Sequence, residues 1–242
     1  MSDQFITVKE ALSTLSTADG LRWIAEKFPD TVKLSTALGK EAQVLTHIIA
    51  TKKIPISIFT VDTGRLFQET YDLHSFTQKK YGININVYFP DAEDVQTMVN
   101  ERGLNCFYDS TEERKNCCNI RKILPFKKGL EGASVWITGL RAEHSAYRKD
   151  LPIVEWDENY QVIKYNPLLH WTADELEQFI VQNNVPVNTL HKKGFPSIGC
   201  APCTKAVQPG EDERSGRWWW ETSNKECGLH QRQPEPKLVK VS

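Results

Sequence analysis

Short apolar segments alternate with amphipathic ones from residue 32 to residue 138, and this alternation limits the folds open to the chain. The short segments are rich in Val, Ile and Leu, and in the longer ones the apolar residues recur every three or four positions. Strands are expected at residues 32–36, 56–61, 83–89 and 135–138, and helices at residues 41–50, 66–76, 92–101 and 117–124. We therefore predict an α/β fold with a doubly wound, mostly parallel sheet flanked by helices.

The flanking segments follow other patterns. Residues 1–30 contain two amphipathic stretches that end ahead of Pro29. Residues 153–156 and 162–165 are typical of a hairpin, and Thr172 begins a capping box that opens a further helix. From Pro186 onward glycine, proline and charged residues predominate, which favours loops. We predict an N-terminal helical segment (1–30), one α/β domain (31–205) and a flexible C-terminal tail (206–242).

Composition excludes several classes of partner. The 242 residues include 30 basic and 31 acidic side chains, so the net charge of -1 gives no overall attraction to nucleic acid or to a membrane. No apolar run is long enough to span a bilayer, and the N-terminus lacks the pattern of a secretory signal. We expect a cytoplasmic protein, in which six cysteines are too few for a disulfide scaffold.

Three of the predicted strands end in loops suited to an anion or a nucleotide. In open parallel sheets, ligands bind at the carboxyl ends of the strands. These loops combine hydroxyl groups, glycines, basic side chains and a following helix N-terminus. They contain neither a Walker A sequence nor a G-x-G-x-x-G dinucleotide motif. The residues that we expect to contact the ligand are Ser35, Thr36, Gly39, Lys40, Asp62, Thr63, Gly64, Arg65, Gly139 and Arg141.

Four cysteines form two close pairs, Cys117-Cys118 and Cys200-x-x-Cys203. Four thiolates can hold a [4Fe–4S] cluster or a zinc ion, and C-x-x-C presents two sulfurs to one metal centre. Neighbouring side chains on a helix point about 100° apart, which suits a cluster because each sulfur can reach a separate iron. The pattern favours the cluster and leaves zinc as the alternative. Cys106 belongs to neither pair and is predicted to be a buried apolar residue.

Four motifs together resemble a known family. Residues 35–40 resemble a degenerate pyrophosphate loop of the adenine nucleotide α-hydrolase superfamily, and residues 61–71 are similar to a stretch of its sulfonucleotide reductase branch. The tail motif Glu226-Cys227-Gly228-Leu229-His230 is similar to the catalytic signature of that branch. With the paired cysteines, these motifs resemble the iron–sulfur type of assimilatory adenylyl-sulfate (APS) reductase, within the PAPS/APS reductase family.

The resemblance implies a reaction at sulfur, in the assimilation of sulfate for cysteine biosynthesis. The thiolate of Cys227 would attack the sulfur of adenosine 5'-phosphosulfate and displace AMP, and thioredoxin or a glutaredoxin-like donor would release sulfite. Position by position, it implies catalytic roles for Lys122 and His230 and a [4Fe–4S] cluster on Cys117, Cys118, Cys200 and Cys203. Arg141, Arg148, Arg214 and Arg217 would bind the anionic substrate. We also expect a homo-oligomer.

Three other functions stay open. A cofactor-free reductase of the 3'-phosphorylated nucleotide (PAPS) would lack the four paired cysteines. A reductase of dual specificity can carry them, so the cysteines do not separate it from an APS reductase. An ATP-dependent sulfurtransferase or tRNA-thiolating enzyme is disfavoured because Ala37-Leu38 stands where a pyrophosphate loop has its second glycine. A zinc-stabilised binding module without catalysis is the third. Basic residues interleaved with aromatic ones would favour nucleic acid, but the pI near 6.6 does not.

Overall fold

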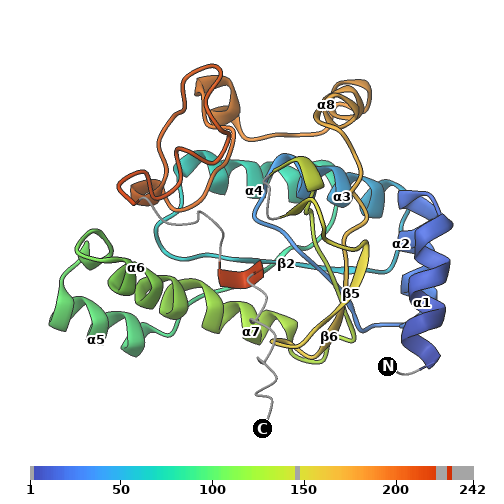
Figure 1. Cartoon of the computed structure of the whole chain (residues 1–242), viewed down its shortest axis with the longest axis horizontal. Coiled ribbons are helices and arrows are strands. Elements are labelled where there is room, and N and C mark those ends of the chain that lie inside the picture. Colours follow the sequence, from blue (N-terminus) through green and yellow to red (C-terminus); the bar gives the residue numbers. More distant parts are fainter. Residues whose placement is uncertain (1–2, 145–147, 222–227, 231–242) are drawn as a thin grey trace, which may run out of the picture.

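The computed structural model describes residues 3–144, 148–221 and 228–230 (Figure 1). The helices are α1 (Asp3–Thr14), α2 (Thr17–Lys27), α3 (Lys40–Thr51), α4 (Gln68–Tyr81), α5 (Ala92–Arg102), α6 (Thr111–Cys118), α7 (Leu124–Leu130) and α8 (Ala173–Gln182). The strands are β1 (Val32–Ser35), β2 (Ser57–Val61), β3 (Asn86–Tyr88), β4 (Val135–Ile137), β5 (Val154–Asp157) and β6 (Val162–Tyr165).

The strands form a six-stranded sheet in the order β3-β2-β1-β4-β6-β5. All neighbours are parallel except β5, which pairs with β6 as an antiparallel hairpin. Leu34 of β1 lies in register with Ile58 of β2 on one side and with Ile137 of β4 on the other. The chain thus leaves β1 in one direction and returns on its other side, which makes the β1–β4 boundary the switch point of a doubly wound sheet. The predicted fold class is confirmed.

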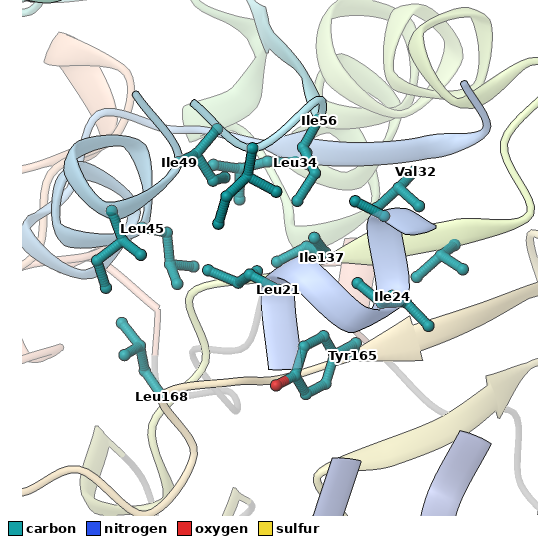
Figure 2. Packing of buried hydrophobic residues seen from close by; sticks show 14 of the residues in the cluster. Leu21, Ile24, Val32, Leu34, Leu45, Ile49, Ile56, Ile137, Tyr165 and Leu168 are labelled. Atoms are coloured by element: carbon teal, nitrogen blue, oxygen red, sulfur yellow. The ribbon is translucent and has the colours of Figure 1, made fainter. Parts of the chain in front are cut away.

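Alternate side chains of the strands enter two separate cores. On one face, Leu34 and Ile137 belong to the larger core cluster together with residues of α2, α3 and β6. Figure 2 shows Leu21 and Ile24 of α2 among these side chains. The smaller core cluster, on the other face, consists of Phe59, Phe126, Leu130, Trp136, Val162 and Leu229. The two-residue period of a strand therefore places α3 and α7 on opposite faces of the sheet, as Figure 1 also shows.

Local sequence sets the ends of several helices. The side chains of Ser16, Asp91 and Ser110 each accept a hydrogen bond from a backbone N–H in the first turn of α2, α5 and α6. The predicted capping box between Thr172 and Glu175 is present at α8. Helix α4 ends at Gly82, whose φ of 63° is the left-handed conformation common after a helix.

One expectation about local structure was wrong in detail. The helix expected at residues 117–124 is divided into α6, a π-helix from Asn119 to Ile123 and α7. Pro125 has no N–H to donate to the carbonyl four residues earlier, and the N–H of Leu124 instead donates to Asn119, five residues back. The segment after Pro186 is loop-rich as expected, yet it buries Leu190 and Trp218. None of the helices in the described ranges has the length and apolar character that crossing a bilayer requires.

A buried ion-pair network holds the β5–β6 hairpin and gives a testable prediction. The ammonium of Lys164, whose side chain is 3% exposed, lies 3.0 Å from a carboxylate oxygen of Glu155 and 3.7 Å from one of Asp157. Replacing Lys164 with Met leaves two carboxylates without their cation. We expect Lys164→Met to lower the free energy of unfolding by about 3–5 kcal/mol in urea denaturation at neutral pH.

The matched control is Lys193→Met, since the side chain of Lys193 is 61% exposed in its ion pair with Glu69. That variant should lose at most about 1 kcal/mol. The deficit of Lys164→Met should shrink as the pH falls, because burial already raises the pKa of Asp157 and protonation removes the uncompensated charge. Equal losses in the two variants would contradict this account of the hairpin.

Candidate functional site

A cavity of about 350 Å³ opens at the carboxyl ends of the parallel strands. The loops after β1, β2 and β4, which we call the first, second and third loops, contribute to its lining, as expected at the switch point of the sheet. Residues 196–203 and 213–218 contribute further parts, although they lie far along the chain from these loops. We call this the edge cavity. Its volume is within the range of small-molecule sites.

Most of the predicted site residues line the edge cavity. They are Ser35, Thr36, Gly39, Lys40, Thr63, Arg65, Cys117, Cys118, Lys122, Gly139, Arg141, Arg148, Cys200, Cys203, Arg214 and Arg217. Asp62 and Gly64 are not among the lining residues. A carboxylate oxygen of Asp62 instead accepts hydrogen bonds from the backbone N–H of Gly64 at 2.8 Å and from the hydroxyl of Tyr71 at 2.9 Å. Asp62 and Gly64 therefore stabilise the conformation of the second loop and do not themselves line the cavity.

The first loop is held in an unusual conformation. Leu38 has a φ of 58°, the left-handed region where a glycine would be unstrained, and its side chain is buried. Its backbone N–H donates to the hydroxyl of Thr36 at 2.9 Å. The third loop comes close to the first at Gly139, where a Cβ would lie 3.0 Å from that of Glu41 and 3.2 Å from the backbone nitrogen of Ala42. A side chain at residue 139 would therefore press against the first turn of α3, which directly follows the first loop.

Two of the predicted cations at this end of the cavity already have carboxylate partners. The guanidinium of Arg141 donates to Glu41 at 3.0 Å and to Glu143 at 3.0 Å, and Arg141 is almost fully buried. Lys40 forms an ion pair with Glu177. Sequence reasoning missed Glu41 and Glu177, both of which line the cavity. The first-loop end of the cavity thus contains paired charges, which suit hydroxyl and amino groups better than a concentrated negative charge.

The paired cysteines come together at another part of the lining. The four thiols share one apolar cluster with Phe107 and Trp218, and none of the four is in a disulfide. The hydroxyl of Thr63 lies 3.2 Å from the sulfur of Cys200. Burial, reinforced by the neighbouring Cys118, raises the pKa of Cys117 to about 12. Four thiolates in this apolar setting would be unfavourable on their own. A positively charged group bound between them would stabilise them.

These cysteines are the residues that fit a metal group best by donor chemistry. Four sulfurs on two segments, α6 and the 3₁₀ turn Ala201–Cys203, supply the thiolate set that an iron–sulfur cluster needs. In the part of the chain that the structure describes, no three Cys, His, Asp or Glu side chains are grouped as a site for a metal ion. The prediction that Cys106 is a buried apolar residue is confirmed, since it is 3% exposed.

Basic side chains border the cysteines. Lys122 lies in the π-helix that directly follows α6, and Arg214 and Arg217 lie in the loop after the 3₁₀ turn. Arg121, which sequence reasoning missed, donates to the backbone carbonyl of Thr63 at 2.9 Å. A cluster of cations around one part of a cavity favours an anion there. We call the part of the edge cavity at the first loop its charge-paired end. The part at the cysteines, where Lys122, Arg214 and Arg217 outnumber Glu213, is its basic end.

The predicted tail motif is described only in part. Cys227 lies outside the described residues, whereas Gly228 and Leu229, which follow it, line the edge cavity. Leu229 packs in the smaller core cluster, and His230 ends the 3₁₀ turn that begins at Gly228. A Cβ on Gly228 would lie 3.1 Å from a methyl group of Ile123, beside Lys122. Gly228 and Leu229 therefore lie next to the π-helix that carries Lys122.

Comparisons with known proteins agree with this architecture. Residues 31–206 match the model of the phosphoadenosine phosphosulfate reductase domain. The chain is 48% identical over 197 residues to the adenosine 5'-phosphosulfate reductase of Agrobacterium fabrum, an alignment that covers 81% of this chain and 76% of that protein. It is also 48% identical over 209 residues to the protein of the same name from Allochromatium vinosum, covering 86% and 82%.

Solved structures give the same result at the level of the fold. A phosphoadenylyl-sulfate reductase from Candida auris, solved as a phosphate complex, is 26% identical, with a TM-score of 0.72 over 86% of this chain and 98% of that one. An FMN adenylyltransferase from Candida glabrata is 18% identical with a TM-score of 0.55, over 98% of this chain and 81% of that one, a likeness of fold alone. The family match spans most of the chain, and the bacterial relatives are nearly half identical over four-fifths of it. We conclude that this chain belongs to the phosphoadenosine phosphosulfate reductase family.

Proposed function

We propose that this chain reduces adenosine 5'-phosphosulfate (APS) to sulfite and AMP in sulfate assimilation. Relatives named adenosine 5'-phosphosulfate reductase support this activity in sequence. The observation that carries the proposal is the division of the edge cavity into a charge-paired end and a basic end, with Gly228 and Leu229 in its lining. The nucleoside of APS suits the charge-paired end, and its phosphosulfate group suits the basic end.

The thiol of Cys227 is the proposed nucleophile. Its thiolate attacks the sulfur of APS, a sulfur–sulfur bond forms, and the sulfur–oxygen bond to AMP breaks as AMP leaves with the electron pair. A thiolate of thioredoxin, or of a glutaredoxin-like donor, then attacks the sulfur of Cys227 and expels sulfite with the bonding pair. The second thiol of the donor resolves the mixed disulfide. The donor ends as a disulfide, and the sulfur has gained two electrons.

Different groups of described residues are proposed to bind the nucleoside and the anionic part of APS. Ser35, Thr36 and Gly39 of the first loop, with Gly139 of the third, form the nucleoside end. Lys122, Arg214 and Arg217, which all line the basic end, are the proposed partners of the sulfonate and phosphate oxygens. Arg148, which is buried and also lines the cavity, is proposed as a further cation. His230, three residues beyond Cys227, is proposed to donate to the substrate.

We infer that Cys117, Cys118, Cys200 and Cys203 hold a [4Fe–4S] cluster. The inference is supported by four free thiols that share one apolar cluster beside the basic end of the cavity. When bound, the cluster would join α6 to the Ala201–Cys203 turn and place a fixed charge beside Lys122. The side chains of Thr63 and Arg121, which contact this region, orient the turn and the second loop. We further propose a cytoplasmic homo-oligomer with residues 206–242 as its catalytic tail.

The proposed function gives a prediction about the nucleophile. Cys227→Ser should bind APS with an affinity within about threefold of that of the unsubstituted chain, because serine keeps the shape of the side chain. It should produce no sulfite and form no covalent sulfonate, because a serine hydroxyl is a poor nucleophile at neutral pH. Calorimetric titration measures binding, and mass spectrometry detects an adduct of one sulfonate on the tail peptide. Sustained sulfite production by this variant would refute the assignment.

A second prediction concerns the metal. Protein purified without oxygen should contain about four iron atoms and four acid-labile sulfides per chain, as a cubane requires. Cys200→Ser should lose most of the iron, whereas the control Cys106→Ser should keep it, because Cys106 is buried outside the four-thiol cluster. Zinc without labile sulfide would instead point to a structural metal ion.

A PAPS reductase is the remaining alternative for the substrate, because the Candida auris structure of that name has a similar fold. The paired charges of Arg141 with Glu41 and of Lys40 with Glu177 favour the nucleotide that lacks the additional phosphate. Sulfite release from the two nucleotides, compared under the same conditions, distinguishes these substrates.

A further inference from the structure

The loop that carries Arg217 contains a strained residue. Trp218 has a φ of 41°, a left-handed backbone that is unfavourable for any side chain with a Cβ. Hydrogen bonds hold the conformation: the N–H of Trp218 donates to the carbonyl of Cys203 at 3.0 Å, and the N–H of Glu221 donates to that of Trp218 at 2.9 Å. The indole is 3% exposed. Strain of this kind persists where surrounding contacts require it, and such sites are often functional.

Two guanidinium groups lie over the ring of Trp218. The central carbon of Arg114, from α6, is 4.6 Å from the ring centroid, and that of Arg217 is 5.0 Å away. Like charges so close to one ring would repel each other unless one were compensated. Glu221 compensates Arg114 through a two-pronged ion pair, with Nε to Oε1 at 2.9 Å and Nη2 to Oε2 at 2.8 Å. Both of these side chains are 6% exposed.

The guanidinium of Arg217 is also confined from another direction. A Cβ on Gly199 would lie 2.2 Å from Nη2 of Arg217 and 2.6 Å from its central carbon, so only glycine at residue 199 leaves room for the group. Nη1 donates to the hydroxyl of Ser197 at 3.4 Å, a long hydrogen bond that does little to fix the group. Contact with Gly199 and stacking on Trp218 therefore define where this cation lies in the edge cavity.

We propose that the Arg114–Glu221 ion pair, acting through Trp218, is a positioning device that sets the guanidinium of Arg217 for the anionic end of the substrate. The proposal rests on the function proposed above, in which Arg217 binds the sulfonated phosphate. Arg114 and Glu221 act through Arg217 and are positioning residues. The pair also joins α6, which carries Cys117 and Cys118, to the loop of Arg217. It therefore holds the guanidinium of Arg217 at a set position relative to these cysteines.

The test compares two ways of displacing the same guanidinium. Glu221→Gln removes the negative charge that compensates Arg114 and keeps the size of the side chain. Gly199→Ala places a Cβ against the guanidinium of Arg217. Both are made in the Cys227→Ser chain, and the Kd for APS is measured by calorimetry without turnover. The control is Glu69→Gln, the same substitution in the exposed pair with Lys193. The same three substitutions in the reactive chain give KM and kcat, and iron content and the melting temperature are recorded for each.

Glu221→Gln and Gly199→Ala should each raise the Kd and KM for APS about tenfold, the effect of losing one well-placed charge-assisted hydrogen bond. The kcat at saturation should stay within about threefold, and Glu69→Gln should change nothing. Because both changes act on one group, the double variant should lose less than the product of the single losses. Arg114→Lys, which keeps the charge but not the fork, should show a smaller rise in KM.

A folded Glu221→Gln protein with an unchanged Kd would overturn the proposal, as would a loss that follows iron content instead of KM. If Gly199→Ala and Glu221→Gln had fully multiplicative effects, the ion pair would not act through Arg217, and the proposal would also fail. Failure of the proposed function has a different signature, because the unsubstituted chain would then produce no sulfite from APS with thioredoxin. In that case the Kd comparison in the Cys227→Ser chain still decides whether the pair positions Arg217.

Discussion

Hydrogen bonding of β1 to β2 on one side and to β4 on the other determines the rest of the molecule. Each of these pairings is parallel, so the carboxyl ends of all three strands meet at the same edge. The direction of winding changes beside β1, which separates the loops and leaves the edge cavity between them. Gly139 then lets the third loop approach Glu41 of α3 closely. Without the pairing of β1 with β2 and β4, the polar residues of these loops would have no common site.

Buried charge is distributed unevenly around this cavity. Arg141 and Arg114 are both compensated by carboxylates that arrive from distant parts of the chain, Glu41 and Glu221. Desolvated cations need such partners, and the same partners reduce their attraction for an external anion. The carboxylate partner of a basic lining residue therefore weighs against its assignment to an anion, as for Arg141.

The sequence was informative where local patterns decide the structure. Apolar periodicity predicted the strands and the hairpin, and the spacing of Thr172 and Glu175 predicted the α8 capping box. The three loop motifs were placed at one edge because parallel strands end together. The pairing of Arg141 with Glu41 joins residues 100 positions apart, and that of Arg114 with Glu221 joins residues 107 apart, so no local pattern could reveal them. The π-helix accompanies the missing N–H at Pro125, whose effect on the helix type the apolar pattern does not reveal. Asp62 has the right position for a ligand contact, but its side chain is used by Gly64 and Tyr71.

The packing of Leu229 in the smaller core cluster affects how the molecule matures. Leu229 follows every strand and α-helix of the described chain, yet it covers Phe59 and Trp136, which belong to the first and middle thirds. As the polypeptide emerges from the ribosome, the sheet can form early, but one of its faces stays incomplete until the last segment arrives. A chain interrupted after α8 would lack the contribution of Leu229 to this cluster, although Phe126 and Leu130 of α7 would still cover part of it. One leucine thus takes part both in completing this core and in lining the edge cavity, which couples the two.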